Sequence, residues 1–199
     1  MSEQKLERLE SDSIGKKYVP RDAYYGVQSL RAHENFHITG QSTHPVMIRS
    51  LAYIKKACAL ANRQAGTLTP KTADAIVAAC DQLLEGKYQD QFIQDPIQGG
   101  AGTSLNMNAN EVIANIAIEI LGGEKGDYTL VHPNDDVNRG QSTNDVIPTA
   151  GKLTALFLLE DLYKSLKALK EAFAQKGVEF DPILKMGRTQ LQDAVPIRL

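Results

Sequence analysis

The chain has 199 residues, of which 42% are hydrophobic and 23% are charged, and its formal net charge is −2. These values suit a folded globular protein with a core of its own and argue against a disordered or fibrous chain. Acidic and basic residues are mixed, so no basic stripe predicts nucleic-acid binding, and the charged residues 1–10 lack the apolar run of a secretory signal.

The N-terminal region predicts a small β-hairpin followed by a short helix. Residues 6–11 and 17–19 flank a turn that contains Gly15, which suits two paired strands. A short helix is expected near residues 27–36.

Three further helices are marked by their start and stop signals. The first runs over 46–65, and the second begins at the Thr69-Pro70 cap and ends at Gly86. The third opens at Thr103 or Ser104 and ends near residue 121, before Gly122-Gly123.

The longest helix is expected from Pro148, in a first turn, to Lys176. At 1.5 Å per residue, about 28 residues would span roughly 42 Å. Its most apolar stretch, residues 153–162, is interrupted by two acidic residues and is too short for a membrane span. Apolar residues cover nearly the whole circumference between Leu156 and Tyr163, so we expect a bundle or an oligomer to pack around it.

Three polar clusters, each beside a long apolar segment, carry the chemistry: residues 99–104, 141–145 and 187–190. Hydroxyl and amide donors next to glycines or a helix start can bind a small carboxylate without a metal. Each cluster also has a structural interpretation: a cap at Thr103 or Ser104, a turn at Asn144-Asp145, and an exposed turn at Gly187.

Other polar residues give weaker signals. Asn108 and Asn110 fall on one side of the helix after the glycine loop, where they line the site or face solvent.

Cys58 and Cys80 lie in helical patterns without metal-ligand spacing, which predicts two buried thiols in a reduced cytoplasmic protein.

Several ordered motifs together resemble the aspartase/class II fumarase family over essentially the whole chain. They are residues 22–36, 99–112, 132–138, 141–145 and 185–196. Three details favour the aspartase branch: Gly102-Thr103-Ser104, the threonine at 143, and the glutamine at 190. The His132-Pro-Asn-Asp-Asp segment is closer to the fumarase branch.

The resemblance implies a mostly α-helical, three-domain subunit with a small N-terminal hairpin. Residues 1–139 would form the N-terminal lyase domain, and 140–199 would begin the central helical-bundle domain. It also implies a cytoplasmic homotetramer without nucleic-acid or membrane partners, whose long helices form a central bundle and whose active sites draw on several subunits.

The reaction implied is the reversible elimination of ammonia from L-aspartate to give fumarate through an aci-carboxylate intermediate, without an organic cofactor or bound metal. Magnesium activation of the intact enzyme stays open. By resemblance the substrate-binding residues are Thr103, Ser142, Thr143, Asn144, Thr189 and Gln190, and a secondary anion site comprises His132, Asn134 and Asp135.

The family's catalytic base is a serine in a mobile Gly-Ser-Ser loop. Residues 1–199 contain no such sequence, so the base is expected beyond Leu199. We therefore expect this chain alone to be inactive and the full-length protein to be active.

Three alternatives stay open. The first is a class II fumarase that hydrates fumarate to malate. The second is a zinc protease, because residues 33–37 read His-Glu-Asn-Phe-His, although Thr43 stands where a third histidine ligand would fall. The third is a non-enzymatic helical assembly module.

Overall fold

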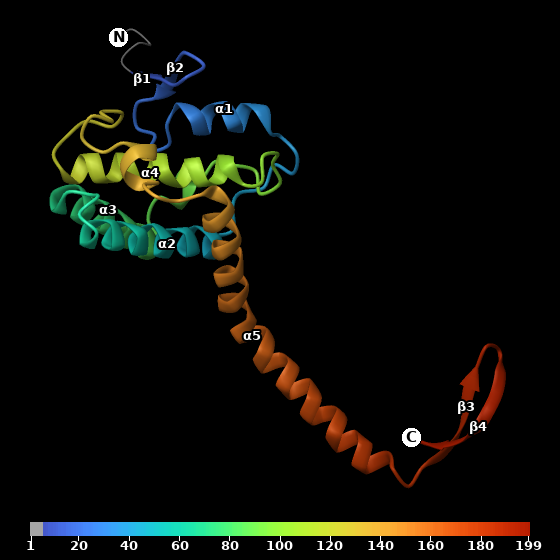
Figure 1. The fold of residues 1–199 in the computed structure, drawn as a ribbon. Coiled ribbons are helices and arrows are strands. Elements are labelled where there is room, and N and C mark those ends of the chain that lie inside the picture. Colours follow the sequence, from blue (N-terminus) through green and yellow to red (C-terminus); the bar gives the residue numbers. More distant parts are fainter. Residues whose placement is uncertain (1–5) are drawn as a thin grey trace. The chain divides into compact units, whose positions relative to one another are not determined.

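The computed structural model describes residues 6–199 and divides the chain into two compact units (Figure 1). The first unit ends at Ala155 and the second runs from Leu156 to Leu199. Each unit is described by itself below. The mostly α-helical fold class is confirmed, whereas the domain boundary expected at 139/140 stays a prediction.

The first unit begins with the expected hairpin. Strands β1 (Glu7–Ser11) and β2 (Lys16–Pro20) pair antiparallel, with Leu9 opposite Tyr18. Gly15 takes a φ of +141° at the turn, a conformation open to glycine but costly for other residues. Helix α1 (Val27–Asn35) follows close to its expected position.

Helices α2 (Pro45–Gln64) and α3 (Pro70–Leu84) pack against each other. The predicted cap of α3 is confirmed, since the Thr69 hydroxyl oxygen accepts the backbone N–H of Thr72 at 3.2 Å. Pro70 then occupies the first helical turn, where its missing N–H costs nothing. The 3₁₀ turn η2 (Gln89–Gln91) begins the passage that leads from α3 to α4.

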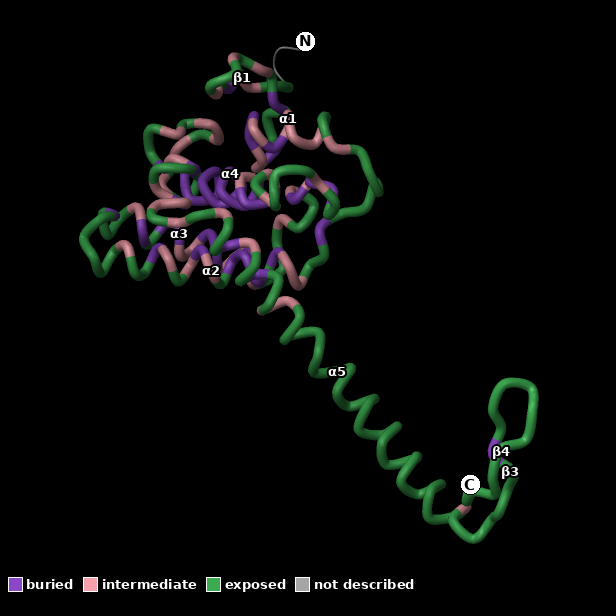
Figure 2. The backbone as a smooth tube through the Cα atoms, turned by 45° about the vertical axis from the view of Figure 1, so that its right-hand side comes forward, coloured by how far each residue is buried: buried purple, intermediate pink, exposed green. Residues whose placement is uncertain are grey.

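Helix α4 (Thr103–Ile120) forms the centre of the first unit, between α1 on one side and α3 with α2 on the other (Figure 1). Figure 2 shows it as the most continuously buried segment of the chain. The side chains of Val112, Ile113 and Ala117 are completely buried. A helix that is covered on most sides needs apolar residues on most sides, as this sequence has.

A buried carboxylate of α4 fixes α1. Glu111 accepts the backbone N–H groups of Gly26, Gln28 and Ser29 at 2.8, 3.0 and 3.0 Å, so it caps the N-terminus of α1. Burial raises the pKa of Glu111, while the hydrogen bonds from Ser29 and Gln28 oppose that rise. The backbone at Gly26 approaches so closely that a Cβ there would lie 2.7 Å from the Glu111 carboxyl carbon.

Helix α5 (Thr143–Phe180) begins five residues before the expected start at Pro148. Proline is typical of a first helical turn, and that preference suggested the later start. In the structure Thr143, Asn144 and Asp145 form the first turn, and Pro148 lies inside the helix on its exposed side.

The second unit contains the rest of α5 and a hairpin that the sequence did not predict. Strands β3 (Leu184–Thr189) and β4 (Gln192–Arg198) pair antiparallel around a tight turn at Gln190-Leu191. The exposed turn expected at Gly187 is therefore wrong. Gly187 lies within β3 at an irregularity in the strand pairing, and it is buried against β4.

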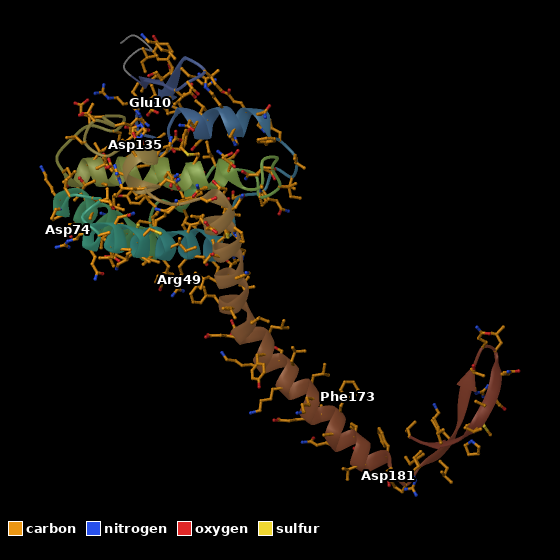
Figure 3. The ribbon with its side chains drawn as sticks, in the orientation of Figure 1. Glu10, Arg49, Asp74, Asp135, Phe173 and Asp181 are labelled. Atoms are coloured by element: carbon orange, nitrogen blue, oxygen red, sulfur yellow. The ribbon has the colours of Figure 1, made fainter. Side chains whose placement is uncertain are left out.

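From Leu156 onward the apolar side chains of α5 are exposed (Figures 2 and 3). The exposed fraction is 52% for Leu162, 51% for Leu166 and 70% for Phe173, whose ring stands clear of the helix in Figure 3. Among residues 6–199, no helix combines the length and apolarity that a membrane crossing requires.

Candidate active site

The glycine loop before α4 turns through three consecutive residues in the left-handed region. The φ angles of Gly100, Ala101 and Gly102 are +79°, +53° and +85°. The Thr103 backbone N–H and hydroxyl both donate to the Gly100 carbonyl oxygen, at 3.1 and 2.7 Å. The exposed Thr103 hydroxyl therefore presents its lone pairs outward, where a ligand ammonium group could donate to them.

The N-cap role expected for Thr103 or Ser104 is wrong. Gly102 occupies that position and offers no side chain. The cap comes instead from upstream, because Gln98 Oε1 accepts the backbone N–H of Leu105 at 3.0 Å. The Thr103 and Ser104 hydroxyls are thus not used to cap α4.

The second cluster forms the N-terminus of α5. The Ser142 hydroxyl oxygen accepts the Asn144 backbone N–H at 3.2 Å, and the Ser142 carbonyl accepts those of Asp145 and Val146 at 3.1 and 3.0 Å. The alternative of a turn at Asn144-Asp145 is therefore wrong, because both residues are helical. Ser142 and Asn144 are exposed, and Thr143 is half-buried.

The fold brings these two helix starts into contact. A Cβ on Gly102 would lie 2.8 Å from Cγ2 of Ile147, so this approach of α4 to α5 requires glycine. Asn106, one turn into α4, donates its Nδ2 hydrogen to the Thr143 hydroxyl oxygen at 3.1 Å. The starts of α4 and α5 thus lie against each other through Gly102–Ile147 and Asn106–Thr143, and each helix N-terminus carries partial positive charge.

A buried lysine lies behind this meeting point. Lys55 of α2 is completely buried, and its Nζ donates to Asn138 Oδ1 at 2.8 Å and to Gln141 Oε1 at 2.9 Å. Asn138 Oδ1 also accepts from Asn106 Nδ2 at 3.1 Å. Hydrogen bonds therefore connect Lys55 to Thr143 through Asn138 and Asn106.

Burial lowers the pKa of Lys55 to about 7, because a desolvated ammonium is costly. Two cysteine thiols nearby act weakly in the opposite direction. Cys80, as expected, is buried and free, and its pKa is raised to about 12, chiefly by burial. Cys58, also free, is only half-buried, so the expectation of full burial is wrong there.

Both interpretations of Asn108 and Asn110 are wrong, because each side chain is completely buried within the first unit. Asn108 donates to the Gln91 carbonyl oxygen at 3.0 Å. Asn110 Nδ2 lies 3.5 Å from the Met107 sulfur. These amides face the protein interior, neither lining the site nor facing solvent.

Sequence reasoning did not single out Lys55, Asn106 or Asn138 behind the site, and it placed Gln141 in a polar cluster without giving it a role. The signal for Lys55 was its position, because it occupies the helical row of Ile48, Leu51, Ala52 and Ala59, all buried. A lysine on an apolar helix face is rarely buried without a specific partner. The other three residues lie inside the family motifs, but their types gave no reason to prefer them.

The third cluster belongs to the second unit. Thr189 ends β3, Gln190 forms the turn to β4, and both side chains are exposed. The structure thus brings together two of the three clusters, and the convergence of the third with them stays a prediction.

The segment of the predicted secondary anion site forms a short π-helix, η3 (Pro133–Val137). His132 Nδ1 accepts the backbone N–H groups of Asn134 and Asp135 at 3.2 and 3.1 Å, and it lies 3.4 Å from the Asp135 carboxylate. In the two shorter contacts Nδ1 is the hydrogen-bond acceptor. Asn134 and Asp135 are exposed, Pro133 between them and His132 is buried, and Asp135 is labelled in Figure 3.

The geometry of the His33–His37 motif does not favour zinc. Helix α1 ends at Asn35, so His37 is not on the next turn of the same helix, and His33 Nδ1 lies 2.7 Å from the Ile93 carbonyl oxygen. Thr43, at the position of a third ligand, is buried. No cluster of three or more His, Cys, Asp and Glu side chains within residues 6–199 is arranged to hold a metal ion.

Comparison with known proteins agrees with the family motifs. A sequence model of the family described as "Lyase" matches residues 15–199, more than nine-tenths of the chain. This chain belongs to that lyase family.

Among curated members, the aspartate ammonia-lyase of Bacillus subtilis is 58% identical over 98% of this chain and 41% of its own length. That of Escherichia coli K12 is 51% identical, with coverage of 96% and 41%. The chain therefore spans about two-fifths of the length of these relatives.

Solved structures place the fold in the same family. A fumarate lyase:delta crystallin from Brucella melitensis, bound to cobalt, matches with a TM-score of 0.87 and 52% identity over 97% of this chain and 42% of that one. A class II fumarase from Schistosoma mansoni matches with a TM-score of 0.83 and 39% identity over 97% and 41%. The higher identity to the aspartate ammonia-lyases favours the aspartase branch.

Proposed function

We propose that the protein carrying this chain is a carbon–nitrogen lyase that eliminates ammonia from L-aspartate to give fumarate, reversibly. The observation that carries the proposal is the contact between the starts of α4 and α5, made by Gly102 against Ile147 and by Asn106 with Thr143. The kinship with aspartate ammonia-lyases at 51–58% identity supports it.

In this reaction a base removes a proton from C3 of aspartate, and the adjacent carboxylate takes up the electron pair as an aci-carboxylate dianion. The electron pair then forms the C2–C3 double bond, and the C2–N bond breaks to release ammonia. Because the C3 proton is weakly acidic, the barrier depends on stabilising the dianion with preorganised donors.

The donors proposed for this task are Ser142, Thr143 and Asn144 at the start of α5, with Thr189 and Gln190 as a second contribution. Thr103 is proposed to contact the substrate from the glycine loop. Helix N-termini favour a dianion more than a monoanion, so they stabilise the intermediate more than the substrate carboxylate.

We further propose that the base is a serine outside residues 1–199, and that His132, Asn134 and Asp135 form a secondary anion site. The assembly proposed is a cytoplasmic homotetramer with a central bundle of α5 helices. The exposed leucines along α5 support this assembly, because such a surface is costly in water.

The decisive experiment is a steady-state assay of the gene's full-length product with aspartate and malate side by side, followed by fumarate absorbance. Turnover of aspartate is expected, and the 199-residue chain alone is expected to be inactive. Thr143→Val should reduce kcat/KM by about 10²–10³-fold, as the loss of one such donor does elsewhere.

Thr72→Val in α3 provides the matched control, because the Thr72 hydroxyl shares an exposed hydrogen bond of 2.9 Å with the Thr69 hydroxyl, at the start of another helix. Turnover of malate in place of aspartate would identify a fumarase. Absence of both activities, together with indifference of dicarboxylate binding to Thr143→Val, would favour the non-enzymatic module.

A further inference from the structure

Three hydrogen bonds connect Lys55, Asn138, Asn106 and Thr143 in series. Which partner donates in each of them is determined by Lys55, because an amine at the end of the series acts as a donor. Both of the Lys55 hydrogen bonds are donated, at 2.8 Å to Asn138 and 2.9 Å to Gln141. An amide side chain can face a partner with its oxygen or its nitrogen, but beside a donor only the oxygen is favourable. Lys55 therefore holds the Asn138 oxygen, and the Gln141 backbone carbonyl, which accepts from Asn138 Nδ2 at 3.0 Å, holds the nitrogen in the same orientation.

The orientation of the Asn138 amide in turn determines that of Asn106. Asn138 Oδ1, held toward Lys55, is also the atom that Asn106 contacts at 3.1 Å. Asn106 must present its Nδ2 to that oxygen, and the same nitrogen contacts the Thr143 hydroxyl oxygen at 3.1 Å. Because Thr143 accepts from Asn106, its own hydroxyl proton is directed away from Asn106.

We propose that Lys55 is a positioning residue that, through Asn138 and Asn106, makes Thr143 a hydrogen-bond donor to the bound dicarboxylate. The inference rests on the proposed function, because it concerns the same binding site. Without Lys55 the Asn138 oxygen loses its charged donor, and Gln141, whose backbone carbonyl accepts from Asn138 Nδ2 at 3.0 Å, loses its own bond to Lys55. The Asn106 amide can then turn over, so that the Thr143 hydroxyl donates inward to Asn106 Oδ1. That oxygen is buried and has no other hydrogen-bond partner among the described residues.

The surroundings of Lys55 explain why this lysine acts through amides. Within residues 6–199, no carboxylate oxygen lies within ion-pair distance of its Nζ. The titratable groups that act on it are Cys58 on α2 and Cys80 on α3. In the 138–141 loop, Arg139 pairs with Asp136 at 3.8 Å. An ion pair would occupy the donors that here orient Asn138 and Gln141.

The test measures the Kd of succinate, a dicarboxylate that cannot react, by calorimetry on the gene's full-length product. Lys55→Met keeps the apolar stem and removes the donors, and it should raise the Kd about tenfold, the effect of losing one hydrogen bond to a charged ligand. We call the hydrogen bonds from Lys55 through Asn138 and Asn106 to Thr143 the relay. Lys56→Met is the control, because Lys56 pairs with Asp81 near the surface and is not part of the relay. It should leave the Kd unchanged.

A double-mutant cycle separates positioning from general damage. In a Thr143→Val background the hydroxyl is already gone, so adding Lys55→Met should change the succinate Kd by less than about twofold. Additive effects of the two substitutions, or an unchanged Kd in Lys55→Met alone, would overturn the inference.

Asn138→Leu interrupts the same relay without touching Lys55, and it decides the question if Lys55→Met does not fold. It should weaken succinate binding in the wild-type background and have little effect beside Thr143→Val. If the wild-type protein bound no succinate, or Thr143→Val bound it normally, the proposed function itself would fail and this inference with it. If the wild-type protein binds succinate and Thr143→Val weakens that binding, but the Lys55 and Asn138 substitutions add to the effect of Thr143→Val, only the role of Lys55 would be rejected.

Discussion

Helix α4 and the part of α5 beyond Leu156 are both rich in apolar residues, yet their environments differ. Nearly every side chain of α4 from Asn108 to Ile118 is buried, whereas leucines such as Leu162 and Leu166 are about half exposed. Helix α4 finds its neighbours in α1, α2 and α3 of the same unit. The comparison shows that an apolar helix surface predicts contact, while the fold decides whether the contact lies within the chain.

The largest expected change in stability concerns the buried helix α4. Ile113→Ala removes a fully buried side chain of α4 and should lower the free energy of unfolding by about 3 kcal/mol, through lost burial and the cavity left behind. Urea unfolding followed by circular dichroism measures the change. A loss below about 1 kcal/mol would mean that α4 is less tightly packed than the structure has it.

The contact of α4 with the start of α5 gives the second prediction. Gly102→Ala places a methyl group against Ile147 and in a left-handed conformation, so it should destabilise the first unit by about 2 kcal/mol and weaken succinate binding. Gly122→Ala is the matched control, because Gly122 has nearly the same φ, +83°, but open space around it. An equal effect of both substitutions would argue against close approach at Gly102.

The third prediction uses the titration of Lys55, a completely buried amine of α2. Its pKa is about 7 in the folded chain and 10.5 in the unfolded chain, so the unfolded state holds the extra proton between these values. Stability should therefore rise with pH above about 7, by about 1 kcal/mol per pH unit.

Measurement below about pH 9 avoids the opposite contribution of Cys80, whose raised pKa favours the unfolded state once its thiol ionises there. Lys55→Met should abolish the rise, and Lys56→Met should retain it. A rise that persisted in Lys55→Met would assign the pH dependence to another group.

The smallest expected change in stability concerns the exposed part of α5 beyond Leu156. Leu166→Ala should change the stability of the monomeric chain by less than about 0.5 kcal/mol, because its side chain is half exposed. It should nevertheless weaken self-association of the full-length product, as measured by sedimentation. Unchanged association would show that this part of α5 is not covered by another copy.

Local signals predicted much of the fold. The Thr69-Pro70 cap, the glycines after α2 and α3, and the β1–β2 turn at Gly15 were read correctly, because each rests on backbone preferences of one or two residues. The same preferences misplaced the start of α5 at Pro148. They also missed the β3–β4 hairpin, whose turn at Leu191 carries a non-glycine residue with a φ of +62°.

The sequence by itself determined the mostly helical architecture, the family and the identity of the polar clusters, since spacing and residue type are written along the chain. The tertiary structure alone decided that the glycine loop and the start of α5 meet, and that Lys55, Asn108 and Asn110 are buried. The physical reason is that burial and hydrogen-bond direction depend on neighbours distant in sequence. A lysine or an asparagine carries no local mark of the partner it will find.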